Sequence, residues 1–382
     1  MGQRPISTLC RHNEPADCPV KPLEKIKAAI KRKSSDAFLI TQPENRRYLS
    51  GYSAIDLSIT ESSGVLLIPA RGAPLLLTDS RYHLQATEEA VGFEIVPVRS
   101  SLLVTLKKIL PQFGIQRLLF ESHYFLHSTA VKLIELGKKQ GIEMVPSGGI
   151  VEKLRTIKSA EEVGKIQQSV YLNELVFKEV YRELVPGRTE REVAIEIEAT
   201  MMRKGAEAPA FPTIVAAGPN AAGPHAVPTD RVIKEGETVI IDMGLKLNGY
   251  CSDMTRTVVL GKPDGRTEEI IRLTRRAQLS ALKVIRAGIL ARDADRAARK
   301  VIADAGYGRY FGHGLGHGVG LAVHEPPSLN RLRRNKLQQG MVVTVEPGIY
   351  LPGWGGVRLE NMVVVEKEGC RPLNRDTTFL DL

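Results

Sequence analysis

Residues 239–260 read VIIDMGLKLNGYCSDMTRTVVL, two runs of strand-forming residues joined by Asn248-Gly249. An Asn-Gly pair between apolar runs is the strongest short-range signal for a two-residue hairpin turn. This turn makes Asp242 and Asp253 diagonal neighbours on one face of the hairpin. Two carboxylates among so many apolar residues would repel each other and would be costly to bury, so the pattern indicates a shared positive ligand. The predicted register pairs Leu247 with Tyr250, Met243 with Met254 and Gly244 with Asp253.

A second acidic hairpin is predicted at residues 341–365, MVVTVEPGIYLPGWGGVRLENMVVV. Glu346 ends one apolar run, and Glu360 begins another after a loop rich in proline and glycine. For one hairpin alone, neutralisation of each glutamate by Arg358 is an open interpretation. Two acidic hairpins in one chain favour a common positive partner.

Residues 311–325, FGHGLGHGVGLAVHE, hold histidines at positions 313, 317 and 324. His313 and His317 have the i, i+4 spacing of helical zinc sites. However, five glycines in nine residues would cost a helix about 5 kcal/mol relative to alanine. We therefore expect extended chain, with residues 313, 315 and 317 on one side and glycines that allow close passage of another segment. No register gives the phosphate-binding pattern G-x-G-x-x-G, and histidines buried in a packing corner are the alternative.

Together these segments supply four carboxylates and at least one histidine, all flanked by strand-forming residues. Such a set suits two divalent cations, with manganese favoured by the oxygen ligands and cobalt or zinc as alternatives. Two cations about 3.5 to 4 Å apart can share a hydroxide and polarise a carbonyl group. The residues thus predict a dinuclear metal site.

The length of 382 residues predicts two domains. Residues 1–20 are interpreted as a polar tail, and no role is assigned to Cys10 or Cys18. From residue 21 to 155, apolar runs alternate with helical stretches, which is typical of an α/β domain. The expected strands lie at residues 37–40, 64–68, 74–78, 117–121 and 142–146.

Residues 156–382 have the pattern of an α+β domain. Two S/T-x-x-E capping boxes, beginning at Ser159 and Thr189, predict long helices that end before Pro186 and at Gly205. Further helices are expected at residues 267–287 and 292–305, and strands at residues 213–217, 238–243, 341–346 and 362–365.

The composition, 43% apolar and 25% charged residues, is that of a soluble globular protein. Neither a membrane-spanning run nor a signal-peptide core is present, so a cytoplasmic protein without membrane partners is expected. Four cysteines without CxxC spacing indicate neither a disulfide framework nor a structural zinc site. The net charge of +10 is spread along the chain, so nucleic acid is not an expected partner.

Five separated blocks resemble the metallopeptidases of the pita-bread fold, a family that includes Xaa-Pro aminopeptidases, prolidases and methionine aminopeptidases. The resemblance implies a C-terminal pita-bread metallopeptidase domain, preceded by a smaller α/β creatinase/prolidase-like N-terminal domain. The blocks, in the family's order, are FPTIVAAGPNAAGPHAVP (211–228), VIIDMGLKLNGYCSDMTRT (239–257), GHGLGHGVGLAVHEPP (312–327), TVEPGIY (344–350) and GVRLEN (356–361).

The resemblance also implies roles for single residues. Asp253 and Glu360 would bridge two metal ions. The full implied ligand set is Asp242, Asp253, His317, Glu346 and Glu360. The implied catalytic residues are His225 near the scissile bond, His324 on the tetrahedral intermediate, and Glu346 as proton shuttle between the bridging water and the leaving amine, while His313 would contact the substrate.

Some neighbouring positions call for separate interpretation. Arg358 and Thr255 stand one or two residues from bridging ligands, so they are candidates for orienting those carboxylates. Thr255 is equally well explained as an ordinary strand residue. Many relatives have aspartate where this chain has Asn361, which should point away from Glu360 and leave the ligand set unchanged.

The N-terminal half resembles the Xaa-Pro aminopeptidase and prolidase branch through NRRYLSGY (45–52) and LLLTDSRYHLQA (75–86). In that branch this domain usually supports a homodimer. We therefore expect release of the N-terminal residue from peptides with proline in second position, by attack of a metal-bridging hydroxide. An Xaa-Pro dipeptidase is the near alternative. A metal-free peptide or nucleic-acid binding module of the same fold is the alternative of another class, and the full ligand set opposes it.

Overall fold

The computed structural model describes residues 22–380, and the predicted tail of residues 1–20, with Cys10 and Cys18, lies outside them. The chain forms two compact units that divide between Ile150 and Val151, within helix α6 (Ile150–Thr156). Each unit has its own hydrophobic core. None of the helices in residues 22–380 is long and apolar enough to cross a membrane.

The first unit is built on a six-stranded mixed sheet, as the alternating pattern predicted. Helices α4 and α5 bury Leu106, Leu110 and Leu133 against strand residues such as Leu39 and Leu118. The expected strands are confirmed, and one more was missed because its residues are half exposed and show no apolar run. In spatial order the strands are β4 (Glu94–Pro97), β3 (Leu75–Thr78), β2 (Val65–Pro69), β1 (Ala37–Ile40), β5 (Arg117–Glu121) and β6 (Glu143–Ser147). The helices are α1 (Pro22–Arg32), α2 (Pro43–Ser50), α3 (His83–Glu89), α4 (Leu102–Gln112) and α5 (His127–Gln140).

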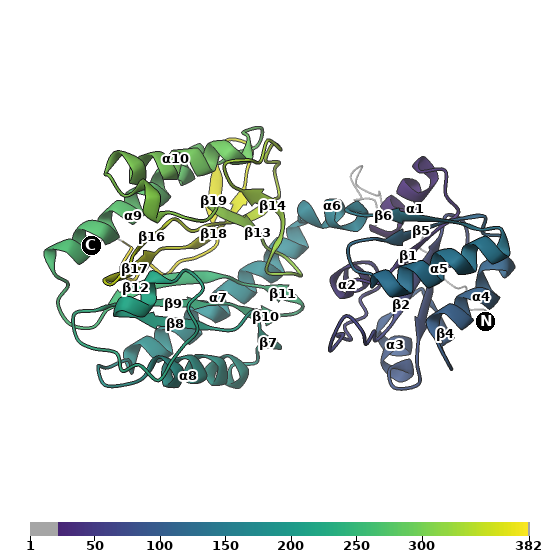
Figure 1. Cartoon of the computed structure of the whole chain (residues 1–382), viewed down its shortest axis with the longest axis horizontal. Helices are drawn as coiled ribbons and strands as arrows, with labels where there is room; N and C mark the ends of the chain where they lie inside the picture. The colour runs from purple at the N-terminus through teal and green to yellow at the C-terminus, as the bar shows by residue number, and fades with distance from the viewer. Residues whose placement is uncertain (1–21, 381–382) are drawn as a thin grey trace, which may run out of the picture. The chain divides into compact units, whose positions relative to one another are not determined.

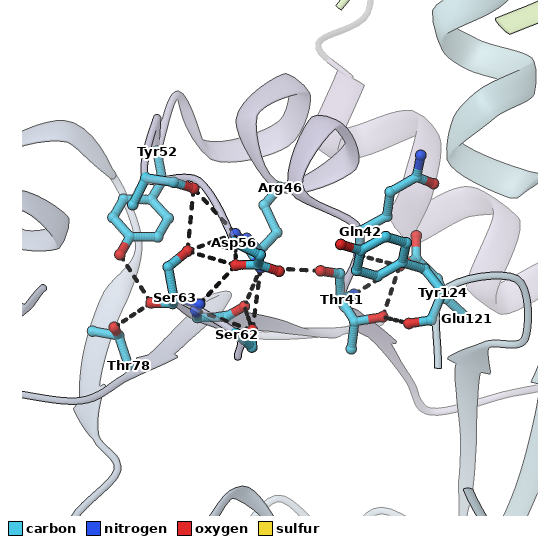
Figure 2. A network of polar contacts seen from close by, with 12 residues as sticks. Thr41, Gln42, Arg46, Tyr52, Asp56, Ser62, Ser63, Thr78, Glu121 and Tyr124 are labelled. Atoms are coloured by element: carbon cyan, nitrogen blue, oxygen red, sulfur yellow. Dashed lines mark hydrogen bonds and ion pairs between the residues drawn. The ribbon is translucent and has the colours of Figure 1, made fainter. Parts of the chain in front are cut away.

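A buried polar network fixes the loop that follows α2 (Figure 2). The guanidinium of Arg46 is completely buried and donates to Asp56 Oδ1 at 2.8 Å and to Ser63 Oγ at 2.7 Å. At the other end of α2, Glu121 accepts the backbone N–H of Thr41 at 2.7 Å. A buried charge must be paired and hydrogen-bonded to be tolerated, and Arg46 meets both conditions. The segment of residues 45–52 therefore has a structural explanation within the first unit.

The second unit places its strands between two pairs of helices (Figure 1). Both predicted capping boxes are present: Ser159 and Glu162 exchange hydrogen bonds at the start of α7, and Thr189 and Glu192 do so at the start of α8. These side chains satisfy backbone N–H groups that a helix leaves unpaired in its first turn. The helices are α7 (Ala160–Arg182), α8 (Glu190–Arg203), α9 (Gly265–Val284) and α10 (Ala291–Asp304), with single 3-10 turns η1 (Gly218–Ala222) and η2 (Gly308–Tyr310).

The strands of the second unit form several small antiparallel sheets. Helices α7 and α8 cover β8, β9 and β12, and helices α9 and α10 cover β15 to β18. This arrangement confirms the α+β prediction. The sheets are β11-β10-β7, β12-β9-β8, β14-β13-β15-β18-β19 and β16-β17. The strands are β7 (Ala208–Pro209), β8 (Ile214–Ala217), β9 (Thr238–Met243), β10 (Leu245–Leu247), β11 (Tyr250–Cys251), β12 (Met254–Val259), β13 (Gly316–Gly318), β14 (Glu325–Leu329), β15 (Val342–Val345), β16 (Gly348–Leu351), β17 (Gly355–Arg358), β18 (Asn361–Val365) and β19 (Cys370–Pro372).

The hairpin of residues 239–260 has the predicted turn. Asn248 and Gly249 both have positive φ, 51° and 81°, as a two-residue type I′ turn requires. The observed register pairs Leu247 with Tyr250, Met243 with Met254 and Thr255 with Asp242. Asp242 and Asp253 therefore lie on neighbouring segments of the hairpin, where the β9–β12 pair gives way to the β10–β11 pair.

Candidate active site

One cavity of about 510 Å³ in the second unit is lined by every residue that the sequence singled out for the site. The walls come from the two acidic hairpins, from the glycine-rich segment and from the chain between β8 and β9. The eight predicted residues in its lining are His225, Asp242, Asp253, His313, His317, His324, Glu346 and Glu360.

The carboxylates and one histidine come close together in this cavity. One ligand atom from each of Asp253, His317 and Glu360 lies within 4.8 Å of the others. His317 Nε2 is 3.3 Å from Glu346 Oε1 and 3.6 Å from Asp253 Oδ2. Asp242 Oδ1 and Glu360 Oε1 are buried and have no hydrogen-bond partner among the described residues. Buried oxygens with free lone pairs are suited to a cation, so the donor set fits divalent metal ions.

The pKa values of these groups point the same way. Burial raises the pKa of the Glu360 carboxyl to about 8, and the nearby charges of Glu346 and Asp242 add to the effect. Burial also raises the pKa of Asp253, followed by the charge of Glu360. Burial opposes the charged forms of His317 and Glu346, yet their mutual hydrogen bond raises the pKa of His317 to about 9 and lowers that of Glu346 to about 2. One imidazolium does not balance this cluster, and bound cations would complete the charge balance.

Two further side chains orient the carboxylates. Thr255 Oγ1 donates to Glu360 Oε2 at 2.7 Å, and Arg358 Nη2 donates to Asp242 Oδ2 at 2.6 Å. Arg358 Nε also donates to Thr255 Oγ1 at 3.1 Å, so the two orienting groups support each other. The geometry agrees with the orienting roles expected for Thr255 and Arg358. The open interpretation that Arg358 neutralises Glu346 or Glu360 is wrong, because its ion pair is with Asp242.

His313 uses both ring nitrogens within the protein. Nδ1 contacts the carbonyl of Gly314 at 2.8 Å, and Nε2 contacts the hydroxyl of Tyr350 at 2.9 Å. Because a carbonyl only accepts, Nδ1 donates and Nε2 accepts from Tyr350. Tyr350 in turn accepts from Arg358 Nη1 at 2.8 Å. Sequence reasoning missed Tyr350, although it lies four residues after Glu346 in the TVEPGIY block.

Other segments of the chain pass close to the glycine-rich segment, as predicted, but one predicted side-chain direction in it is wrong. A Cβ on Gly316 or Gly318 would collide with the carbonyl oxygen of Thr344 or Pro326. The prediction that residues 313, 315 and 317 share one side is wrong, because Leu315 is buried in the core beneath α9 and α10. Regular strand begins only at Gly316, so the alternation does not extend back to position 313.

The two remaining predicted histidines, His324 and His225, also line the cavity, and both are exposed. The ring of His324 stands almost perpendicular to that of His317, with centroids 4.2 Å apart. Burial lowers the pKa of His324, and the charge of His317 adds to this effect. His225 lies in the chain after η1, beside an apolar part of the wall. That part consists of Phe211, Pro212, Ile214, Val227 and Pro228.

This fold and this cavity define a metallopeptidase of the pita-bread class, which confirms the predicted fold class. The chain belongs to metallopeptidase family M24, whose sequence profile matches residues 164–367, and residues 22–157 match the creatinase/prolidase N-terminal domain. It is similar to the Xaa-Pro dipeptidase of Pyrococcus horikoshii, with 36% identity over 92% of this chain and 97% of that protein. Among solved structures, the Xaa-Pro dipeptidase from Bacillus anthracis matches with a TM-score of 0.87 and 36% identity, covering 94% of this chain and 98% of that one. The X-Pro aminopeptidase from Thermotoga maritima matches with a TM-score of 0.82 and 35% identity, covering 90% and 97%.

Proposed function

We propose that the protein is an Xaa-Pro dipeptidase that uses two divalent cations. The observation that carries the proposal is the convergence of four carboxylates and His317 on one cavity, with buried carboxylate oxygens left without partners among the described residues. The names of the Pyrococcus horikoshii and Bacillus anthracis relatives favour the dipeptidase alternative over the aminopeptidase expected from the sequence. Aminopeptidase activity is the second candidate, supported by the likeness to the Thermotoga maritima X-Pro aminopeptidase.

In this proposal Asp242, Asp253, His317, Glu346 and Glu360 hold the two cations. Bound there, the cations supply a nucleophilic water at neutral pH and polarise the scissile carbonyl. Manganese is the proposed metal, with cobalt and zinc as alternatives. Thr255 and Arg358 keep the carboxylates in position through the hydrogen bonds described above.

The substrate's own contacts come from the walls. His324, which lines the cavity, donates a hydrogen bond to the oxygen on which negative charge develops. The carboxylate of Glu346 accepts a proton from the attacking water and gives it to the proline nitrogen that leaves. The apolar wall near His225 receives the proline ring, and the ring of His313, held by Gly314 and Tyr350, contributes a flat side to the same space.

Hydrolysis assays on Ala-Pro and Ala-Pro-Gly, with manganese, cobalt or zinc added after chelation, test the proposal. Cleavage of the dipeptide alone supports a dipeptidase, and equal cleavage of both peptides supports the aminopeptidase candidate. The Asp253→Ala variant should lose activity and bound metal, measured by elemental analysis, while Glu368→Ala on an exposed turn should keep both. Absence of cleavage and of metal in the wild-type protein would refute the proposed function.

Two predictions from the sequence accompany this proposal. A homodimer is proposed from the resemblance of the N-terminal half, and light scattering measures it. A cytoplasmic location is proposed as well, and fractionation of cells that express the full chain tests it.

A further inference from the structure

The two glutamates of the proposed metal site lie where the chain passes from one sheet to another. Strand β15 ends at Val345 and strand β18 begins at Asn361, and these two residues pair with each other. Strands β16 and β17 pair with each other in a separate sheet. Glu346 and Glu360 fall between the two strand pairs and lie outside all four strands. Strand pairing therefore does not hold the backbone at these two positions.

A single buried side chain, that of Gln278 in α9, contacts the backbone before both glutamates. Gln278 is completely buried, and its Nε2 donates to the carbonyl of Val345 at 3.1 Å and to the carbonyl of Leu359 at 3.0 Å. Each of these carbonyls belongs to the peptide unit that leads directly into a glutamate, Glu346 or Glu360. Because a peptide unit is planar, a contact with its carbonyl also restrains the backbone nitrogen of the glutamate.

The N–H side of each peptide unit is held as well. Glu346 N donates to the carbonyl of Leu315 at 2.9 Å, and Glu360 N donates to the carbonyl of Thr255 at 3.1 Å. The two peptide units are thus fixed at both ends, by Gln278 on the carbonyl side and by neighbouring backbone on the N–H side. A buried carbonyl without a partner costs free energy, and the amide of Gln278 supplies a partner to two carbonyls at once.

The orientation of the Gln278 amide is fixed by its oxygen. Arg275 Nη1, one turn earlier in α9, donates to Gln278 Oε1 at 2.7 Å. A guanidinium only donates, so the atom that it contacts is the amide oxygen. The NH₂ group therefore faces the two carbonyls, and both of its hydrogens are used.

A purely structural role for Gln278 is the alternative explanation. A buried amide that ties a helix to a sheet contributes to stability, and its loss need not affect a binding site. What distinguishes Gln278 is that both of its acceptors directly precede a proposed metal ligand, one at the end of β15 and one just before β18. One side chain thus restrains the two carboxylates relative to each other.

We propose that Gln278 is a positioning residue that fixes Glu346 and Glu360 relative to each other through their backbone. The inference rests on the proposed function, because it takes the two glutamates as metal ligands. Gln278 does not line the active-site cavity, so it acts on the ligands without touching the substrate.

Calorimetric titration of the chelated protein with Mn²⁺ tests the proposal. Gln278→Met nearly keeps the size of the side chain and removes both hydrogen bonds to the carbonyls. We expect its affinity for Mn²⁺ to fall at least tenfold, as is typical when a group that orients metal ligands is lost. At saturating Mn²⁺, kcat for Ala-Pro should fall about tenfold while KM changes little, because the reacting groups rather than the substrate contacts are displaced.

Thr274→Val is the matched control. Thr274 is also completely buried in α9, and its hydroxyl donates to the carbonyl of Ile270 at 2.8 Å, within the helix itself. Both variants should lower the urea midpoint of the metal-free protein, but Thr274→Val should keep the wild-type affinity for Mn²⁺. Should Gln278→Met not fold, Gln278→Glu takes its place, since it keeps the shape, donates at most one hydrogen and pairs with Arg275. Its added negative charge attracts cations, so a loss of affinity is then the stricter result.

The affinity for Mn²⁺ decides between the two explanations. A folded Gln278 variant with the wild-type affinity overturns the positioning role, whatever its stability, and leaves the proposed function intact. An equal loss of affinity in Thr274→Val overturns the positioning role as well. If the wild-type protein neither binds Mn²⁺ nor cleaves Ala-Pro, the proposed function fails, and this inference fails with it.

Discussion

Glu325 is expected to stabilise the second unit far more than an exposed glutamate does. The substitution Glu325→Gln keeps the size of the side chain and removes the negative charge with which the buried Arg155 and Lys158 pair. Both cations are almost completely buried, and both lie within 2.7 Å of a Glu325 oxygen in the wild-type structure. Removal of one partner from a buried ion pair typically costs about 3 to 5 kcal/mol. We therefore expect the free energy of unfolding to fall by about 4 kcal/mol.

Urea unfolding of the chelated protein, followed by tryptophan fluorescence, measures this loss. The chain has a single tryptophan, Trp354, which lies between β16 and β17 and therefore reports on the second unit. Glu368→Gln, on an exposed turn, should change stability by less than about 0.5 kcal/mol. Adding Lys158→Met to Glu325→Gln removes one uncompensated charge and should restore about 1 to 2 kcal/mol.

Activity gives an independent readout of the same substitution. Glu325 follows His324 directly, so a displaced Glu325 should disturb the imidazole that we propose contacts the substrate oxygen. We expect kcat of the variant to fall by at least tenfold, measured under conditions in which the variant protein is still folded. A Glu325→Gln variant with wild-type stability and wild-type kcat would refute the reasoning on the buried ion pairs.

Three further predictions follow from single contacts. Thr255→Val removes the hydrogen bond to Glu360 and should weaken metal binding about tenfold, as measured by calorimetry, and unchanged affinity would contradict an orienting role. Gly316→Ala should destabilise the second unit by about 1 to 3 kcal/mol because its Cβ would collide with the Thr344 carbonyl, whereas Gly312→Ala, with open space around its Cβ, is the control and should cost under about 0.5 kcal/mol. In the metal-free protein, the Glu360 pKa of about 8 lies above its ordinary value of 4.5, so the native state holds this proton when the unfolded state has lost it. Its contribution to stability is present below pH 4.5 and is lost by about 1.4 kcal/mol per pH unit up to pH 8. Urea unfolding at several pH values should therefore show a steeper decline for wild type than for Glu360→Gln, and equal slopes would count against the raised pKa.

Local signals predicted most of the fold. The Asn248-Gly249 turn, the two capping boxes and the apolar runs of the first sheet all act within a few residues, and each is found where the sequence placed it. Strand β4 was not predicted because it pairs at the sheet edge through its backbone, and its side chains are half exposed. Leu315 was placed on the wrong side because the tertiary core, rather than strand alternation, sets its direction.

The candidate site was harder to predict, because it is held together by contacts between residues far apart in the sequence. The sequence identified acidic hairpins and histidines, but their joint assignment as ligands came from the resemblance to a family. The ion pair of Arg358 with Asp242 joins residues 116 positions apart, and that of Arg155 with Glu325 joins residues 170 positions apart. No periodicity or spacing encodes such pairs, because they arise only when separate strands and helices pack together.

The choice between dipeptidase and aminopeptidase lies outside the metal centre. Both reactions break the same bond to proline, so the proposed metal ligands and the proposed roles of His324 and Glu346 would serve either reaction equally well. The substrates differ beyond proline, where a dipeptide carries a negative charge and a longer peptide carries a neutral amide. Binding energy can discriminate between them only through groups that meet this difference. Arg358 is committed to Asp242 and Glu325 is neutralised by its two buried partners, so neither side chain is available to meet this difference.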